Sequence, residues 1–201
     1  MIKQERLVNS FCDLVRIDSP SDEEEEVALH LTDRLSRLGF SVVRDAHGNV
    51  IASEDGANPL LLSAHMDTVE PGRGIQPIIK GNRITSDGTT ILGGDCKAGL
   101  TIVLEALTSV VESSARHRPV EVAFTRAEEG GLVGVHHLDF GQLSAKQGVV
   151  FDGEGSVSRV TVAAPSQNVV TANIQGRSAH AGVEPEKGIS AIIIAAEILT
   201  Q

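Results

Sequence analysis

Residues 60–67, Leu60-Leu61-Leu62-Ser63-Ala64-His65-Met66-Asp67, carry the pattern that decides the fold of this chain. The run from Leu60 to Ala64 is short, apolar and free of alternating polar side chains, which is typical of a strand buried on both faces. Two further segments have the same character, Val120 to Thr125 and Gly148 to Phe151. Such strands occur in parallel sheets that helices cover, so the three segments predict an α/β fold with a mostly parallel mixed sheet flanked by helices.

Helical periodicity separates these strand segments. Apolar side chains recur three and four positions apart in residues 3–17, between Ser21 and Gly39, and in residues 97–112, which predicts three amphipathic helices. Ser21 followed by Glu24 fits a capping box at the start of the second helix, and Gly39 fits its stop. Further short strands are expected at 40–43, 49–52, 75–79 and 83–85.

Acidic residues and a histidine directly follow the three apolar strands. His65 and Asp67 follow the first strand, Glu128 and Glu129 the second, and Asp152 the third. In an open α/β sheet, ligand sites form beyond the carboxyl ends of the strands. The three clusters are therefore expected to converge in one crevice.

A fourth acidic residue, Asp95, lies in the glycine loop Gly93-Gly94-Asp95-Cys96-Lys97-Ala98-Gly99 at the start of a helix. The glycines let the backbone approach closely whatever Asp95 binds. The loop has no Lys-Ser/Thr pair, so we reject a phosphate-binding P-loop. Cys96 is interpreted as a small buried residue beside Asp95 rather than as a soft ligand or a nucleophile.

One imidazole with several carboxylates is the ligand set of a hydrolytic metal site. Zn²⁺ accepts N and O donors, and two metals can share a carboxylate at a separation of about 3.5–4 Å. His-x-Asp on an extended segment suits one ligand, His65, and one orienting residue, Asp67. Adjacent Glu128 and Glu129 point in different directions, so one can bind metal while the other transfers protons. Taken singly, each cluster has an ordinary alternative, a surface turn or a helix cap; their joint placement at strand ends favours a site.

The composition of the 201-residue chain argues against several other classes of function. With 17 Lys and Arg against 27 Asp and Glu, the net charge of −10 argues against nucleic-acid binding and against an anionic membrane surface. Five Phe, no Tyr and no Trp make a stacking platform for bases or sugars improbable. No apolar run reaches the ~18 residues of a membrane span. Two cysteines and an N-terminus without an apolar signal segment favour the cytoplasm.

The composition changes toward the C-terminus. Val160 to Val162 and Val169 to Ile174 alternate like half-buried strands. A helix is expected to begin near Glu186 or Lys187 and still to be running at Gln201 without a capping signal. A chain that stops inside an apolar helix is expected to be truncated.

With these residues in view, the chain resembles the M20 family of co-catalytic zinc metallopeptidases, most closely its peptidase T-like branch. The resemblance covers the whole chain, and five sequence blocks carry it in the family's order. They are Ser63 to Val69 around His65, Gly94 to Gly99 around Asp95, Thr125 to Gly131 around Glu128 and Glu129, Phe151 to Gly153 around Asp152, and Gly176 to Gly182 around His180.

The resemblance implies a zinc-exopeptidase-like fold and a role for each residue at the strand ends. By analogy with the family, His65 and Asp152 would bind one zinc ion, Asp95 would bridge two, and Glu129 would bind the second. Glu128 would be the general base that takes a proton from the metal-bridging water.

Two supporting roles are also implied by the resemblance. Asp67 would tune His65 from behind. His180 belongs to the lid or dimerisation domain; in family members it reaches the active site, often that of the partner subunit, and helps to polarise the scissile carbonyl.

This chain departs from the family in length. Family members continue through the lid and return to the catalytic domain, which brings a last His ligand to the second zinc. Residues 1–162 are therefore expected to be an incomplete catalytic domain, and residues 163–201 the start of an inserted α+β lid or dimerisation domain. Two zinc ions are expected in a complete subunit, with one or none in this chain, which by itself is expected to be inactive. A complete protein is expected to form a homodimer through the lid.

The function that the resemblance implies is zinc-dependent hydrolysis of short peptides, as in aminopeptidases and tripeptidases. Two alternatives remain open from the sequence. The first is a non-catalytic homologue that acts as a binding or dimerising module. The second is an amidohydrolase of N-acylated amino acids with the same fold. Intact His65, Asp95 and Glu128 favour the enzyme over the first alternative, because a decayed homologue is expected to lose the base or the bridge first.

Overall fold

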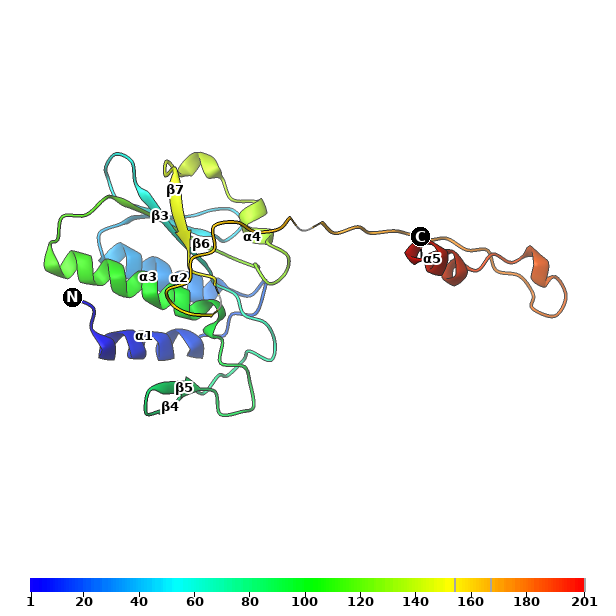
Figure 1. Ribbon diagram of the computed structural model, residues 1–201, viewed down its shortest axis with the longest axis horizontal. Helices are drawn as coiled ribbons and strands as arrows, with labels where there is room; N and C mark the ends of the chain where they lie inside the picture. Colours follow the sequence, from blue (N-terminus) through cyan, green and yellow to red (C-terminus); the bar gives the residue numbers. More distant parts are fainter. Residues whose placement is uncertain (154, 167, 201) are drawn as a thin grey trace. The chain divides into compact units, whose positions relative to one another are not determined.

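The computed structural model describes residues 1–153, 155–166 and 168–200, which form two compact units, Met1–Arg159 and Val160–Gln201. The first unit contains the strands and the helices around them, coloured from blue to yellow in Figure 1. The second unit contains helix α5 (Ala191–Leu199) and a single 3-10 turn, η2 (Pro185–Lys187), and no strand among the residues described there.

A five-stranded sheet forms the centre of the first unit, in the order β1-β2-β6-β3-β7. Its strands are β1 (Ser41–Arg44), β2 (Val50–Ser53), β3 (Leu60–His65), β6 (Val120–Thr125) and β7 (Gln147–Val150). β3 pairs in parallel with both β6 and β7, whereas β2 is antiparallel to both β1 and β6. All strands except β2 therefore point the same way, which confirms the predicted α/β fold with a mostly parallel mixed sheet.

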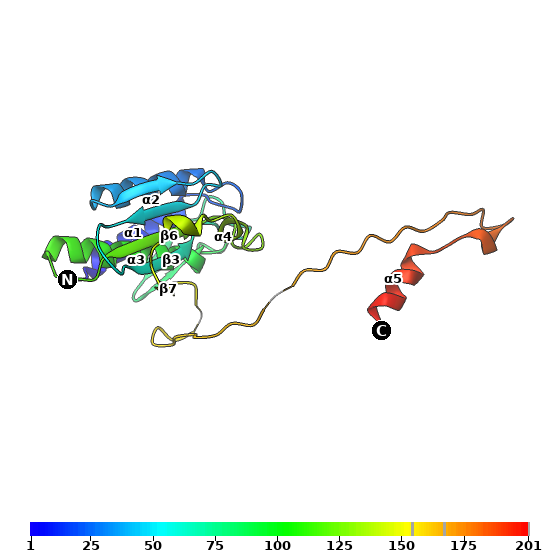
Figure 2. The ribbon, with the colours of Figure 1, turned by 90° about the horizontal axis from the view of Figure 1, so that it is seen from above.

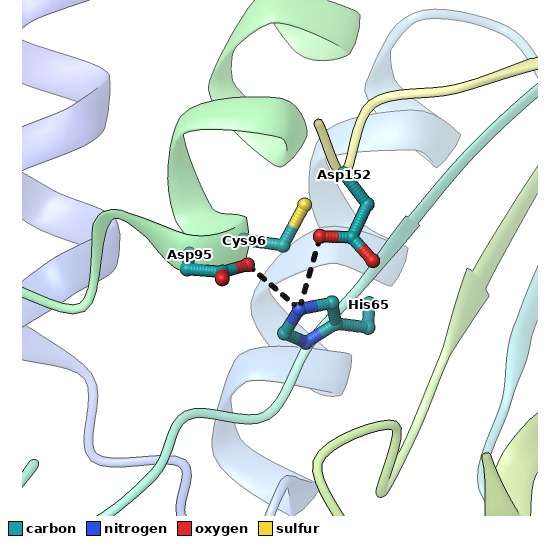
Figure 3. A group of neighbouring side chains, drawn as sticks. All are labelled: His65, Asp95, Cys96 and Asp152. Atoms are coloured by element: carbon teal, nitrogen blue, oxygen red, sulfur yellow. Dashed lines mark hydrogen bonds and ion pairs between the residues drawn. The ribbon is translucent and has the colours of Figure 1, made fainter. Parts of the chain in front are cut away.

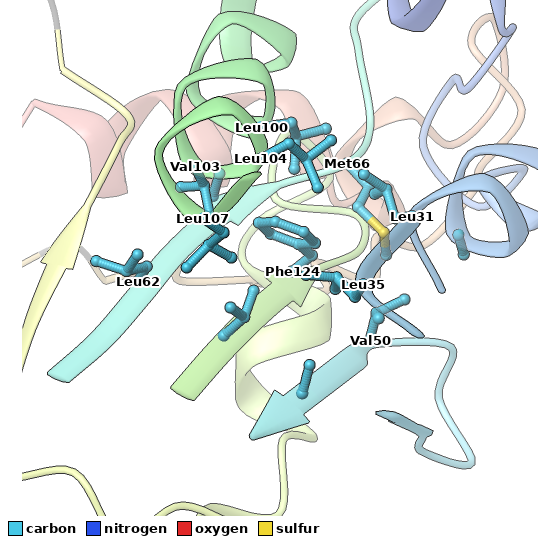
Figure 4. Close-up of a cluster of buried hydrophobic side chains, with 14 of the residues drawn as sticks. Leu31, Leu35, Val50, Leu62, Met66, Leu100, Val103, Leu104, Leu107 and Phe124 are labelled. Carbon is cyan, nitrogen blue, oxygen red and sulfur yellow. The ribbon is translucent and has the colours of Figure 1, made fainter. Parts of the chain in front are cut away.

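Two helices, α2 (Glu25–Arg37) and α3 (Gly94–Ser113), pack on one face of this sheet, and α1 (Gln4–Arg16) packs against α3 and contributes to the same core. Alternate residues of the strands point toward these helices, because successive side chains of a strand face opposite sides. The main apolar core lies at this interface, where Phe124 of β6 is fully buried against Leu31, Leu35, Leu100 and Leu104 (Figure 4). This packing fixes the start of α3 against the sheet.

A thinner layer covers the opposite face of the sheet. It consists of α4 (Val133–His136) and the 3-10 turn η1 (Phe140–Gln142), and its small core contains Ile51, Ala123 and Leu138. Figure 2 shows the sheet with α2 on one side and α4 near the carboxyl end of β6. A separate hairpin of β4 (Ile78–Lys80) and β5 (Arg83–Thr85) completes the first unit.

Strand β7 differs from its predicted burial. Val149 and Val150 are 44% and 67% exposed, because β7 has a described neighbour on one side only, β3. The strand itself was correctly predicted, at 148–151 against 147–150. Hydropathy indicates that a segment is a strand but not whether it lies at the centre or at the edge of the sheet.

The predicted capping box of α2 is wrong. The helix starts at Glu25, and its N-cap residue Glu24 makes no side-chain cap hydrogen bond. The Ser21 hydroxyl donates to Asp67 instead, and the Glu24 carboxylate accepts the backbone N–H of Ala127. Both side chains are thus used in long-range contacts. Gly39 does end the helix, with φ at +92° and with the Phe40 N–H bonded back to the Leu35 carbonyl.

The second unit also differs from expectation. Residues 160–162 and 169–174 form no strand, and the one described bridge joins Arg177 to Ile189. Helix α5 begins at Ala191 rather than near Glu186, because the Ser190 side chain caps it by accepting the N–H of Ile193. The helix was expected to be still running at Gln201, but it ends at Leu199 with Thr200 as its C-cap residue; Gln201 itself lies outside the described residues. No helix in the described parts of the chain combines the length and apolar character needed to cross a bilayer.

Candidate metal centre

The carboxyl ends of β3, β6 and β7 meet at one edge of the sheet. His65 is the last residue of β3 and lies opposite Thr125, the last residue of β6. Ser63 of β3 lies opposite Val150, so Asp152 leaves β7 next to His65. This register follows from the parallel pairing, which aligns the three strand ends.

Asp152 and Asp95 both approach the Nε2 atom of His65 (Figure 3). The Oδ1 atom of Asp95 lies 3.1 Å from Nε2, and the Oδ1 atom of Asp152 lies 3.8 Å from it. Asp95 reaches this point from the N-terminal end of α3, where the backbone is extended rather than helical and the Asp95–Cys96 peptide is cis. The imidazole is buried, whereas the Asp95 side chain is 72% exposed, so the cluster opens to solvent.

Glu128 and Glu129 also lie close to the same imidazole. His65, Glu128 and Glu129 each offer one ligand atom, and these atoms lie within 4.8 Å of one another. The same limit holds for the group of His65, Asp95, Cys96 and Asp152. Two groups of donors therefore share one buried imidazole.

Asp67 lies behind the imidazole and is fully buried. Its Oδ1 atom lies 3.3 Å from the Nδ1 atom of His65. Oδ2 accepts the Ser21 hydroxyl at 2.6 Å, and the two oxygens accept the backbone N–H groups of Glu128 and Glu129. Burial disfavours the charge of Asp67, but these contacts outweigh it and lower the pKa of its carboxyl.

The carboxylates shift one another's protonation. Burial lowers the pKa of His65, but the carboxylates of Asp67 and Asp95 more than compensate and raise it to about 9. Burial raises the pKa of Glu128, Glu129 and Asp152, and repulsion between neighbouring carboxylates adds to each shift. Negative charge is thus concentrated around one imidazole, an arrangement that a cation would stabilise.

The donor set fits a divalent metal. One imidazole nitrogen and several carboxylate oxygens are the ligands that Zn²⁺ takes in hydrolytic sites. The residues that could hold it are His65, Asp95, Asp152 and Glu129.

Cys96 is buried and its thiol donates to the carbonyl of Phe151 at 2.6 Å. Burial, with the nearby Asp152 carboxylate, raises the pKa of this thiol to about 12. A thiol with so little thiolate is a poor nucleophile, which agrees with the interpretation of Cys96 as a small buried residue.

A cavity of about 220 Å³ adjoins the cluster. His65, Glu128 and Asp152 line one part of it, and Leu132, Val135 and Val150 line another. The space beside the carboxylates therefore has an apolar wall that could receive an aliphatic group.

His180 lies in the second unit, where its Nδ1 atom accepts the N–H of Gly182 at 3.2 Å. His136 and His137 are not among the donors grouped around His65. His137 stacks on His47 with ring centroids 4.2 Å apart, as expected of surface residues rather than ligands.

The sequence did not reveal the contacts of three buried polar residues, Lys97 in the loop of Asp95 and two residues that bind the segment of Glu128. Lys97 is fully buried and its ammonium group donates to the carbonyl of Ile17, while burial lowers its pKa to about 8. Asn49 and Glu24 bind the backbone of the segment that carries Glu128. No local sequence signal marks these contacts, because the partners lie 77 to 103 positions away in the chain.

Residues 61–196 match the family described as Peptidase family M20/M25/M40. Among curated proteins, YqjE of Bacillus subtilis, an uncharacterized protein, is 40% identical over 212 residues, covering 100% of this chain and 57% of that protein. Peptidase T of Geobacillus thermodenitrificans is 28% identical over 250 residues, covering 100% of this chain and 60% of its own length.

Solved structures of peptidases are also similar to this chain. Aminopeptidase PepT from Bacillus cereus superimposes with a TM-score of 0.81 at 40% identity, covering 100% of this chain and 57% of that one. A tripeptidase from Staphylococcus aureus gives a TM-score of 0.80 at 31% identity, with the same coverage of 100% and 57%. The chain thus spans less than two thirds of the length of these relatives.

Proposed function

Because the chain belongs to peptidase family M20/M25/M40, we propose that the cluster around His65 is the metal centre of a zinc-dependent peptidase acting on short peptides. The observation that carries this proposal is the approach of the Asp95 and Asp152 carboxylates to the Nε2 atom of His65, with two glutamates close to the same imidazole. The names of the similar proteins, peptidase T and a tripeptidase, support a short peptide as substrate.

Each ligand in the proposal has a structural reason. His65 and Asp152 would hold one zinc ion, Glu129 would hold a second, and Asp95 would be shared by the two. When bound, such ions polarise a carbonyl and make a water molecule acidic near neutral pH. Asp67 orients His65, because its carboxylate lies beside Nδ1 and leaves Nε2 directed at the ligand carboxylates.

Glu128 is the proposed general base. Its carboxyl is adjacent to the ligands, and burial with its acidic neighbours raises its pKa above the ordinary glutamate value. A base whose pKa lies closer to the working pH accepts a proton and then returns it more readily to the leaving amine. The cavity wall of Leu132, Val135 and Val150 supports apolar contact with the substrate next to this base.

The remaining roles rest on the family resemblance alone. We propose residues 1–162 as catalytic domain and residues 163–201 as part of a lid or dimerisation domain. His180 is proposed to polarise the scissile carbonyl. The homodimer and the cytoplasmic location remain predictions.

The test uses a protein that contains this chain and reaches the length of its relatives. It is assayed with tripeptides bearing a free amino terminus and with N-acetyl amino acids, before and after treatment with a chelator. Hydrolysis of the tripeptides that the chelator abolishes and Zn²⁺ restores is the expected result. Cleavage of the acetyl compounds alone would instead identify an amidohydrolase, and no hydrolysis of either would favour a binding module.

A further inference from the structure

Four consecutive backbone N–H groups, from Arg126 to Glu129, donate to side chains of distant elements. Arg126 donates to Oδ1 of Asn49 at 3.1 Å, and Ala127 donates to Oε1 of Glu24 at 2.8 Å. Glu128 and Glu129 donate to the two oxygens of Asp67 at 2.9 and 3.2 Å. We call the three acceptors Asn49, Glu24 and Asp67 the amide clasp. Every amide of the segment that carries the two glutamates is therefore held from outside the segment.

The clasp side chains are buried although they are polar. Asn49 is 0% exposed, Glu24 is 5% exposed and Asp67 is 0% exposed. Burying a carboxylate or an amide is unfavourable unless its hydrogen bonds are made, so each side chain depends on the amides that it binds. The dependence is mutual, because a buried loop amide needs an acceptor as well.

Asn49 also holds the far end of the same loop. Its Nδ2 atom donates to the carbonyl of Gly134 at 3.0 Å, and the Gly134 N–H bonds to the carbonyl of Arg126. A Cβ atom at Gly134 would lie 2.6 Å from Oδ1 of Asn49, so the close approach requires glycine. Asn49 thereby closes the loop from Arg126 to Gly134 at both ends.

Glu24 acts at the turn of the segment. Ala127 has φ at +44°, in the left-handed region that residues with a side chain rarely adopt. The Glu24 carboxylate holds the N–H of this residue, directly before Glu128. The unusual conformation turns the chain after β6. Beyond this turn, the ligand atoms of Glu128 and Glu129 lie within 4.8 Å of each other and of a ring nitrogen of His65.

We propose that Asn49 and Glu24 are positioning residues, which hold Glu128 and Glu129 at the metal centre through the backbone of residues 126–129. The inference rests on the proposed function, because it assigns these two residues a role toward a metal. It predicts that loss of Asn49 or Glu24 weakens the metal position that uses Glu129 and spares the position formed by His65, Asp95 and Asp152.

The test is a calorimetric titration of the 201-residue chain with Zn²⁺, carried to millimolar concentration to resolve a tight and a weak event. The variants are Asn49→Ala, Glu24→Ala and Glu24→Gln. We expect the two alanine variants to lose about 10- to 100-fold in the affinity of the weak event, as for other residues that support metal ligands. The tight event should be unchanged. Glu24→Gln keeps an acceptor oxygen for Ala127 and should restore the weak event.

A matched control separates positioning from general destabilisation. Glu121, on β6, is also a buried carboxylate. It accepts the backbone N–H groups of Ser144 and Ala145, which lie in a segment without site residues. Glu121→Ala should lower the melting temperature without changing either zinc event. Amide hydrogen exchange should show faster exchange of residues 126–129 in the Asn49 and Glu24 alanine variants only.

The outcomes distinguish the inference from the function on which it rests. A weak event that is unchanged in both alanine variants, or absent in the wild type, overturns the inference and leaves the tight site standing. If Glu121→Ala loses as much affinity in the weak zinc event as the two alanine variants, the inference is also overturned, because general destabilisation would then explain the loss. A wild-type chain without any zinc event overturns the proposed metal centre and the inference together.

Discussion

The Asp67 carboxylate accepts the backbone N–H of Glu128 at 2.9 Å through the same oxygen that lies 3.3 Å from Nδ1 of His65. One buried carboxylate thus joins the end of β3, which carries the histidine, to the segment after β6, which carries the glutamates. This side chain therefore links the proposed ligand His65 directly to the proposed base Glu128. The negative charge of Asp67 acts on His65, whereas its oxygens accept backbone N–H groups, and substitutions can distinguish these two effects.

Asp67→Asn should lower the zinc affinity of the chain by about 10- to 100-fold, the range seen when residues behind a ligating histidine are replaced. The substitution removes the charge beside Nδ1 and places an NH₂ group against a backbone N–H. Ser21→Ala is the control, because it removes only the hydroxyl that donates to the same carboxylate. Calorimetric titration with Zn²⁺ measures the zinc affinity of both variants. Equal affinities in Asp67→Asn and wild type would contradict the role given to Asp67.

Glu128→Gln should retain metal and lose turnover, by about 10²- to 10⁴-fold, because an amide cannot take up the proton. The measurement is kcat on a tripeptide, with metal content determined on the same preparation, in a protein of the relatives' length. Glu129→Gln is the matched control one residue away and should lose metal instead. Substantial turnover in Glu128→Gln would remove Glu128 from the mechanism.

His180→Ala should lower kcat more than it lowers zinc content in the same longer protein. The proposed contact is made to charge that develops on the substrate carbonyl, so it stabilises the transition state more than the bound metal. Metal analysis and steady-state kinetics on one preparation separate the two effects. If zinc content fell while kcat per bound zinc stayed constant, His180 would be a ligand.

Asp152→Asn should abolish tight zinc binding in the 201-residue chain. With His65 and Asp95, Asp152 would complete three ligands, whereas among the described residues we assign only Asp95 and Glu129 to the other position. We expect at most one tightly bound zinc ion per wild-type chain and negligible peptidase activity. Two tight ions with turnover would show that another residue of the chain completes the second position.

The Arg6–Glu105 pair predicts a pH-dependent contribution to stability. The Glu105 side chain is 2% exposed, Nε of Arg6 lies 2.6 Å from it, and this contact lowers the pKa of Glu105 from 4.5 to about 2. A lowered folded-state pKa stabilises the fold above pH 4.5, and this contribution is lost as the pH falls from there to about 2.

Glu105→Gln should therefore lower the free energy of unfolding by on the order of 2 kcal/mol near neutral pH, and by progressively less toward pH 2. Urea unfolding at several pH values measures the difference from wild type. Glu23→Gln is the control, because Glu23 pairs with Arg73 at an exposed site, where an ion pair contributes little. A pH-independent difference in Glu105→Gln would contradict the electrostatic origin.

Much of the fold follows from local sequence. β6 and β5 begin and end where the pattern placed them, and β3 extends one residue further. Continuous apolar runs and helical periodicity are local properties, so they indicate strands and helices without any tertiary information. The strand ends also predicted which polar residues would meet, because parallel pairing aligns the carboxyl ends of β3, β6 and β7.

Tertiary structure decided what these elements do with their polar side chains. Ser21 and Glu24 have the spacing of a helix cap, yet they bind Asp67 and Ala127, which lie 46 and 103 positions away from them. The exposure of Val150 and the irregular backbone at 169–174 likewise depend on neighbours that no local pattern specifies. A polar side chain bonds to whichever donor or acceptor the completed fold brings within reach, and that choice is settled only when distant segments have packed together.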